Sequence, residues 1–249
     1  MSFRLAKDAR PQARTLLLVT ALSIALWFVP YAEIVTYPFR LFVTFIHEGG
    51  HALAAVLTGN AVYGLRIMSS GSGVTLTTEN GLLSGLIISS AGYLGAMLYG
   101  ALLLLLIRRA VVARRVLILS AALILTLTVA YGLTSLFTVI AGVIISSGLL
   151  LAALFFSPQA ATFLINFLAA QCVLNALLDL KTALFLSSPF APRVPTDAMN
   201  MAEATGIPAF LWSIIWIALA LMILFYALRS FAEKRTPTQP DLPFDDELD

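Results

Sequence analysis

Long apolar runs separated by short polar connections occupy most of this chain. A helix that crosses the hydrocarbon core of a membrane needs about 20 consecutive, mostly apolar residues. On this measure the pattern predicts spans near residues 15–32, 39–58, 81–106, 115–131, 135–156, 160–180 and 208–230. Gly132 is a weak divider between the fourth and fifth of them, so we expect about six to seven transmembrane helices.

Two connections have patterns of their own. Residues 61–79, AVYGLRIMSSGSGVTLTTE, alternate apolar and polar positions around a Gly-rich turn, which is typical of a β-hairpin. Residues 195–208, PTDAMNMAEATGIP, predict a short helix with Thr196 or Asp197 as its N-cap and Gly206 just past its end. We therefore expect an all-α polytopic membrane protein with a small membrane-associated β-hairpin.

The composition agrees with a membrane protein. Of the 249 residues, 60% are apolar and 11% are charged, whereas soluble domains have roughly 25% charged residues. The formal net charge is only +2 and no basic face stands out, which argues against a nucleic-acid partner. With a single cysteine, Cys172, the chain has no internal disulfide.

The two ends of the chain are polar. Residues 1–14 are basic, and the positive-inside rule predicts that they form a cytoplasmic tail. Residues 232–249 are polar, with acidic residues at the end, and we expect them to be disordered. Residues 15–231 then form one domain within the membrane.

One apolar run, residues 42–59, contains both histidines of the chain and a carboxylate. His47, Glu48 and His51 form an H-E-x-x-H motif, and residues four apart on a helix share a face, so both imidazoles can reach one ion. An ionisable group in mid-membrane costs about 2.5–3.5 kcal/mol, which a bound divalent ion would offset. We expect Zn²⁺ on His47 and His51, with Glu48 as the general base.

A catalytic zinc site needs a third protein ligand. Asp179 is the first candidate, because it is a lone carboxylate near the end of an apolar helix; an ion pair with Lys181 or Arg193 is the competing interpretation. Asp197 is the second candidate, although its position also suits a helix N-cap. The sequence leaves the choice between Asp179 and Asp197 open.

Other residues are candidates for binding substrate or supporting the ligands. Asn175 lies one turn before Asp179, where it could orient the carboxylate or hold a substrate carbonyl; a hydrogen bond between helices is an equally good interpretation. Gly73, beside the turn of the predicted hairpin, is the other candidate. Cys172 shares the face of Asn175 and Asp179, and we interpret it as a packing residue.

Four features of the chain carry a resemblance to a known family: the segment FIHEGGHALAAVLTG, the Gly-rich hairpin after it, ISSAGYLGAMLYG in the next span, and an aspartate late in a further span. With these features the chain resembles the site-2 protease class of intramembrane zinc metallopeptidases. The small single-domain bacterial branch is most similar, and TDAMNMAEATGIPAFLW also resembles it. Better-known members have Ala-Gly-Pro where this chain has Ala-Gly-Tyr, so that Tyr93 replaces the proline. They have Leu-Asp-Gly where this chain has Leu-Asp-Leu, so that Leu180 follows Asp179.

The resemblance implies that residues 15–231 are an intramembrane metalloprotease domain in the bacterial cytoplasmic membrane. Its reaction would be hydrolysis of a peptide bond in or near a transmembrane segment of a membrane-protein substrate. The alternative is a non-proteolytic metal-binding membrane protein, either a transporter or a degenerate protease that acts as a regulator. Glu48 between the histidines favours the protease, because transport needs no general base. The substrate and the oligomeric state do not follow from the sequence.

Overall fold

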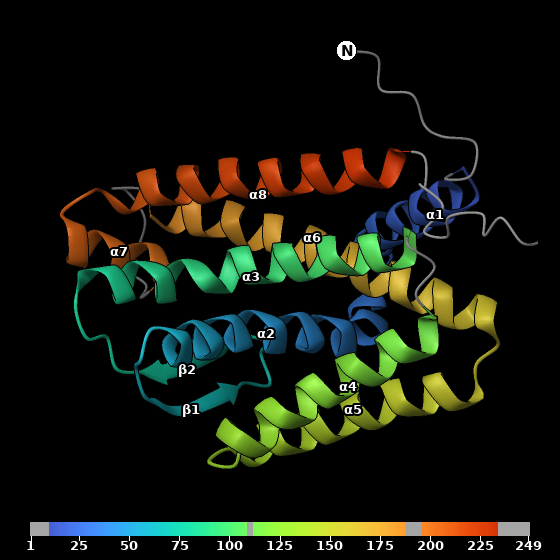
Figure 1. Ribbon diagram of the computed structural model, residues 1–249, viewed down its shortest axis with the longest axis horizontal. Coiled ribbons are helices and arrows are strands. Elements are labelled where there is room, and N and C mark those ends of the chain that lie inside the picture. Colours follow the sequence, from blue (N-terminus) through green and yellow to red (C-terminus); the bar gives the residue numbers. More distant parts are fainter. Residues whose placement is uncertain (1–9, 109–111, 188–195, 234–249) are drawn as a thin grey trace, which may run out of the picture.

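The computed structural model describes residues 10–108, 112–187 and 196–233, which form a bundle of helices with one hairpin (Figure 1). The elements are α1 (Arg10–Leu26), α2 (Ala32–Leu57), β1 (Val62–Ile67), β2 (Gly73–Thr77), α3 (Leu82–Arg108), α4 (Ala113–Tyr131), α5 (Leu136–Phe155), α6 (Pro158–Leu186), α7 (Asp197–Thr205) and α8 (Ala209–Ala232). The expected combination of an all-α membrane fold and one small hairpin is confirmed.

The central helix is α3, which packs against α2, α6 and α8 (Figure 1). The helices α4 and α5 form an antiparallel pair beside α2, and α1 packs on α6. A Cβ atom at Gly50 of α2 would overlap the backbone carbonyl of Ala91 in α3, so glycine at this position allows the two helices to approach closely. The side chain of Cys172 is fully buried between α6 and α3, in agreement with a packing role.

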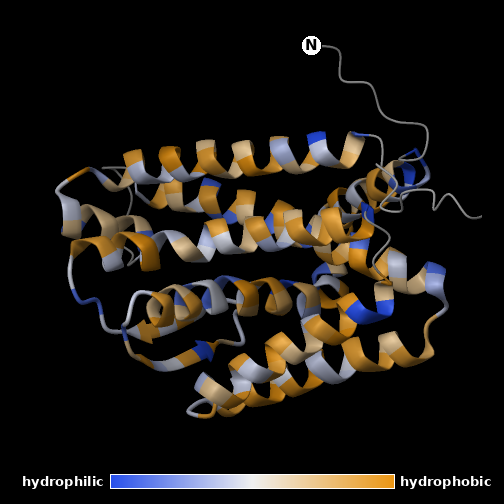
Figure 2. Cartoon of the chain, in the orientation of Figure 1, coloured by the Kyte–Doolittle hydropathy of each residue, from blue (hydrophilic) through white to orange (hydrophobic). Residues whose placement is uncertain are grey.

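Five of the described helices, α3, α4, α5, α6 and α8, are long and apolar enough to cross a membrane. Apolar residues predominate along them in Figure 2, whereas the connection from the hairpin to α3 is polar. The first two predicted spans correspond to α1 and α2, which do not meet the same measure. The helix α1 has only 17 residues, and α2 carries Glu33, Arg40 and Glu48 along its length.

The predicted hairpin and the predicted short helix are both present, and they lie at the same end of the bundle (Figure 1). The strands β1 and β2 are antiparallel, with an irregularity between Val62 and Gly64. The helix α7 is capped by Thr196, whose hydroxyl accepts a hydrogen bond from the backbone N–H of Met199 at 3.3 Å. Gly206 follows its end with a φ of 74°, the left-handed conformation that favours glycine.

The predicted tails fall largely outside the described part of the chain. Of the basic segment expected over residues 1–14, residues 1–9 are not described, and α1 begins at Arg10. Of the acidic segment expected over residues 232–249, residues 234–249 are not described, and α8 ends at Ala232. The description therefore covers most of the 15–231 domain.

Candidate metal centre

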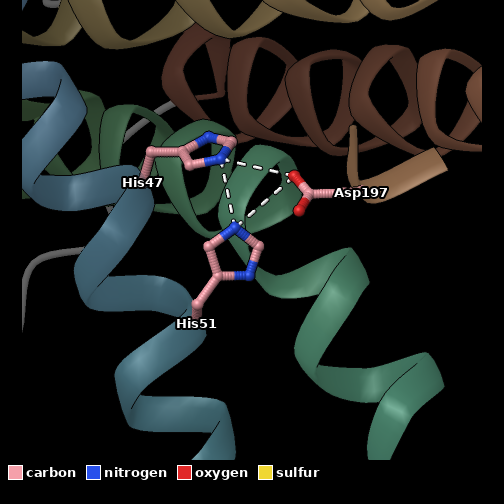
Figure 3. Close-up of side chains that lie close together, drawn as sticks. All are labelled: His47, His51 and Asp197. Carbon is pink, nitrogen blue, oxygen red and sulfur yellow. Dashed lines mark hydrogen bonds and ion pairs between the residues drawn. The ribbon is translucent and has the colours of Figure 1, made fainter. Parts of the chain in front are cut away.

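Two helices from distant parts of the sequence bring three potential metal ligands together (Figure 3). His47 and His51 come from successive turns of α2, and Asp197 is the first residue of α7. The Nε2 atoms of the two histidines are 3.1 Å apart. One carboxylate oxygen of Asp197, Oδ2, lies 3.6 Å from Nε2 of His47 and 3.5 Å from Nε2 of His51.

These three atoms fit the ligand set of one zinc ion. Zinc binds imidazole nitrogen and carboxylate oxygen at about 2.0–2.2 Å, so the ligand atoms around one tetrahedral ion lie roughly 3.3 Å from one another. The distances between the three ligand atoms, 3.1, 3.5 and 3.6 Å, lie on either side of that value. Two imidazoles and one carboxylate also leave one tetrahedral position for a water molecule or a substrate.

The orientation of His51 is fixed by a second hydrogen bond. Its Nδ1 atom lies 2.7 Å from the backbone carbonyl oxygen of Ile88 in α3. Because a carbonyl oxygen only accepts hydrogen bonds, Nδ1 must carry the proton and donate it. In a neutral His51 the lone pair is then on Nε2, which faces His47 and Asp197, as a metal ligand requires.

The carboxyl group of Asp197 is ready to act as an anionic ligand. Burial by itself raises the pKa of this carboxyl group, but the adjacent imidazoles of His47 and His51 outweigh the burial and hold its pKa below the ordinary value. Thr196 supplies the N-cap of α7, so the side chain of Asp197 is not needed for capping. It projects instead toward the two histidines (Figure 3).

The tight packing of α3 against His47 and His51 depends on Gly92. A Cβ atom at this position would overlap the Nε2 atoms of both His47 and His51. Glycine is thus the residue that lets the backbone of α3 pass directly beside the imidazoles, where larger side chains would displace them.

The hairpin holds Glu48 beside the three candidate ligands. Its side chain is buried, and the hydroxyl of Thr75 in β2 lies 2.7 Å from Oε2 of the carboxylate and 3.0 Å from the backbone carbonyl oxygen of the same residue. Gly73, the first residue of β2, leaves room for this arrangement, since a Cβ atom there would be only 2.6 Å from Oε1 of Glu48. A carboxylate so positioned can accept a proton from a water molecule on the ion.

These residues line one cavity of about 400 Å³, which has both polar and apolar walls. Its walls come from α2, β2, the first half of α3, the end of α6 and α7. Residues with chemically active side chains line it: His47, Glu48, His51, Thr75, Tyr93, Asp179, Asp197 and Asn200. The cavity is large enough to hold several water molecules next to the three candidate ligands.

Asp179, the first candidate for the third ligand, lines the same cavity. It does not belong to the close group of His47, His51 and Asp197, whose ligand atoms lie within 4.8 Å of one another. From the sequence, Asp179 was expected to be a lone carboxylate near the end of an apolar helix. In the structure Arg40 of α2 lines a second, adjoining cavity together with Asp179, and its charge acts on the carboxylate. Asp179 forms no ion pair with Lys181, and Arg193 lies outside the described residues.

Asn175 also lies in the adjoining cavity with Arg40 and Asp179. Its side-chain amide donates hydrogen bonds within α6, to the backbone carbonyl oxygen of Gln171 at 2.8 Å and to Oε1 of that residue at 3.0 Å. It therefore makes neither the expected contact with a ligand nor a hydrogen bond to another helix among the described residues. Its amide oxygen faces no described donor, which leaves it available to a peptide.

Thr75 is a residue of the site that was not predicted from the sequence. A signal for it exists in the alternation of the hairpin, because residues two apart on a strand face the same side. Once Gly73 is placed at the site, Thr75 must lie on the same face, and both line the cavity. Tyr93 was noticed only as a replacement for proline, whereas its ring contacts that of His47, with centroids 4.7 Å apart.

The chain matches one family of known proteins. A family model described as Peptidase M50B-like matches residues 16–227, which is most of the chain. The matched stretch includes His47, Glu48, His51 and both aspartates considered as the third ligand. No curated protein and no solved structure matches the chain.

Proposed function

Because the chain belongs to the Peptidase M50B-like family, which is the site-2 protease family, we propose that it is an intramembrane zinc metalloprotease. Membership makes it a metallopeptidase, and its apolar helices make it an integral membrane protein. The proposal goes further in three respects. It assigns Zn²⁺ as the cofactor, a peptide bond in or near a transmembrane segment of a membrane protein as the substrate, and the bacterial cytoplasmic membrane as the location.

The observation that carries the proposal is the position of Glu48 beside the three potential ligands. A metal site used only for structure or transport needs His47, His51 and a carboxylate, but it needs no further buried carboxylate. Glu48 is buried, lines the same cavity and receives a hydrogen bond from Thr75. This arrangement is what hydrolysis by a general base requires.

In the proposed site His47, His51 and Asp197 hold the ion. Zinc, when bound, supplies Lewis-acid activation of water and of a carbonyl group. Glu48 accepts one proton from the attacking water, whose oxygen forms a bond to the carbonyl carbon. As the carbon–nitrogen bond breaks, Glu48 returns the proton to the leaving amine. The hydroxyl of Thr75 keeps the carboxylate of Glu48 directed into the cavity throughout.

We assign Asp197 rather than Asp179 as the third ligand, and we place Asp179 in the part of the cavity that receives the substrate. Its neighbours there, Arg40 and Asn175, offer donors and an acceptor to a peptide backbone. Gly73 belongs to the same side, because its lack of a side chain keeps the approach to Glu48 open.

The hairpin offers a means of holding the substrate. A helical peptide bond is shielded by its own hydrogen bonds, so the substrate must be extended locally before water can attack it. Among the described residues β2 pairs only with β1, and β2 borders the cavity. An extended substrate segment could add to the second edge of β2 through main-chain hydrogen bonds. In the other interpretation, the hairpin is a connection that covers the site.

The proposal is tested with membranes that contain either the native protein or the Glu48→Gln variant. Proteomic comparison should reveal one or a few membrane proteins that accumulate uncut with the variant. Purified protein in lipid vesicles should then cleave that substrate, lose cleavage after zinc removal by a chelator and regain it when zinc is returned. Stoichiometric zinc without any cleaved substrate would instead support the non-proteolytic alternative, a transporter or a regulator.

A further inference from the structure

Tyr93 is held in a fixed position beside the candidate metal centre. Its ring lies edge-on to that of His47, with an interplanar angle of 81°, and its other neighbour is the ring of Trp216 in α8, 5.3 Å away between centroids. Trp216 is fully buried, and its indole N–H donates a hydrogen bond to the hydroxyl of Ser90 at 3.0 Å. Packing from two helices thus restricts the orientation of the Tyr93 ring.

The hydroxyl group of Tyr93 belongs to the cavity. Tyr93 is 8% exposed and lines the cavity with His47 and Glu48. Three carboxylates, Glu48, Asp179 and Asp197, line the same cavity, so the side chain of Tyr93 borders the space between α2, α6 and α7.

This hydroxyl has no acceptor in the part of the chain that the structure describes. Tyr99, on the same helix, shows the usual arrangement, because its hydroxyl is 2.7 Å from that of Ser120. The hydroxyl of Tyr93 is not among the fully buried side-chain atoms that lack a partner, so it is accessible from the cavity that Tyr93 lines. Tyr93 therefore offers an unpaired donor beside His47, where a reacting carbonyl group would lie.

We propose that Tyr93 is a catalytic residue whose hydroxyl donates a hydrogen bond to the oxygen of the scissile carbonyl as that oxygen becomes negatively charged. The inference rests on the proposed function. When the oxygen of water bonds to the carbonyl carbon, an electron pair moves onto the carbonyl oxygen, and Glu48 takes one proton from the water. The electron pair returns when the carbon–nitrogen bond breaks, and the amine receives the proton from Glu48. Tyr93 keeps its own proton.

The hydrogen bond is strongest when the charge on the oxygen is greatest, so it lowers the barrier more than it strengthens substrate binding. A fixed donor is especially effective, because no reorganisation is needed during the reaction.

The test compares Tyr93→Phe with the unsubstituted protein, on the substrate identified by the Glu48→Gln comparison. Phenylalanine keeps the ring contacts with His47 and Trp216 and removes only the hydroxyl. Loss of one such donor lowers kcat by about 10²–10³-fold, and we expect this loss with KM and bound zinc unchanged. A phosphinate analogue of the cleavage site should bind more weakly by a similar factor. Tyr99→Phe, on the same helix, should retain the native kcat.

Other outcomes overturn the inference. A kcat within about threefold of the native value, with zinc bound, would show that the hydroxyl takes no part in the reaction. Reduced zinc content in Tyr93→Phe would show that Tyr93 supports His47 instead. Both outcomes leave the proposed protease function intact. Absence of zinc-dependent cleavage by the unsubstituted protein would overturn the proposed function, and the role of Tyr93 with it.

Discussion

The carboxylate of Asp197 lies 3.5 Å from Nε2 of His51, which joins the first residue of the short helix α7 to the middle of α2. The helix α7 has only nine residues, too few to cross a membrane, and it packs against α3 and α8. The ligand atoms of His47, His51 and Asp197 all lie within 4.8 Å of one another, a spacing that suits one zinc ion.

Replacing Asp197 should remove zinc. Asn in place of Asp197 has nearly the same shape but no charge, so we expect zinc affinity to fall at least tenfold, as is typical when support of a metal site is lost. Asp179→Asn is the matched control, because it alters a carboxylate in the same cavity and should leave zinc bound. Zinc content and competition with a chelator measure both variants. The opposite pattern, with zinc lost only from Asp179→Asn, would identify Asp179 as the ligand.

Thr75 should affect the reaction without affecting the metal. Thr75→Val preserves the shape of the side chain and removes the hydrogen bond to Oε2 of Glu48. Hydrogen bonds to charged groups contribute about 1.5–3 kcal/mol, so kcat/KM should fall roughly 10-fold to 100-fold while zinc content stays constant. Thr75→Ser restores the hydroxyl and should recover most of the activity. Equal activity in Thr75→Val and native protein would exclude this role.

Gly92 should tolerate no side chain. In Gly92→Ala the new methyl group overlaps the imidazoles of His47 and His51, so the histidines must move apart from their positions. Overpacking of this kind destabilises proteins by about 1–3 kcal/mol, and we expect zinc loss as well. Gly148→Ala in α5 is the control, because no atom lies within 4 Å of the added carbon. Thermal unfolding in detergent and zinc content distinguish the two variants; full zinc content in Gly92→Ala would contradict the packing described.

Thr138 should anchor the hairpin. Its buried hydroxyl accepts a hydrogen bond from the backbone N–H of Ile67 in β1 at 2.8 Å, which ties the hairpin to α5. Thr138→Val leaves that N–H without a partner, which costs about 1–3 kcal/mol. The midpoint of thermal unfolding should fall, whereas Thr126→Val, at an exposed position of α4, should leave it unchanged. An unchanged midpoint in Thr138→Val would show that the hairpin does not depend on this contact.

The helices and the hairpin were predictable because their signals are local. Apolar length located α3, α4, α5 and α8 to within two residues, whereas α1, α2 and α6 differ from the predicted spans by about five to seven residues at one end or both. The alternation around the SSGSG turn located β1 and β2. The short helix α7 followed from Thr196 and Gly206, whose capping roles depend on adjacent residues. His47, Glu48 and His51 were recognisable for the same reason, since they lie on adjacent turns of one helix.

The choice of the third ligand was not predictable because it depends on contacts between distant segments. Spacing within α6 gave Asp179 a suitable face but could not show that Arg40 of α2 lies near it. Asp197 came second because its position also suits a helix N-cap, whereas in the structure its neighbour Thr196 takes that role. Only the packing of α7 on α3 brings Asp197 to His47 and His51.

The most direct test of the account measures zinc content and substrate cleavage on the same preparations of native protein and of Glu48→Gln. Glutamine keeps the size and polarity of Glu48 but is no base, and it is not one of the three ligands. We predict about one zinc ion per chain in both proteins, as one catalytic site requires, with cleavage by the native protein alone. Cleavage by Glu48→Gln, or native protein that is folded and binds no zinc, would contradict the account.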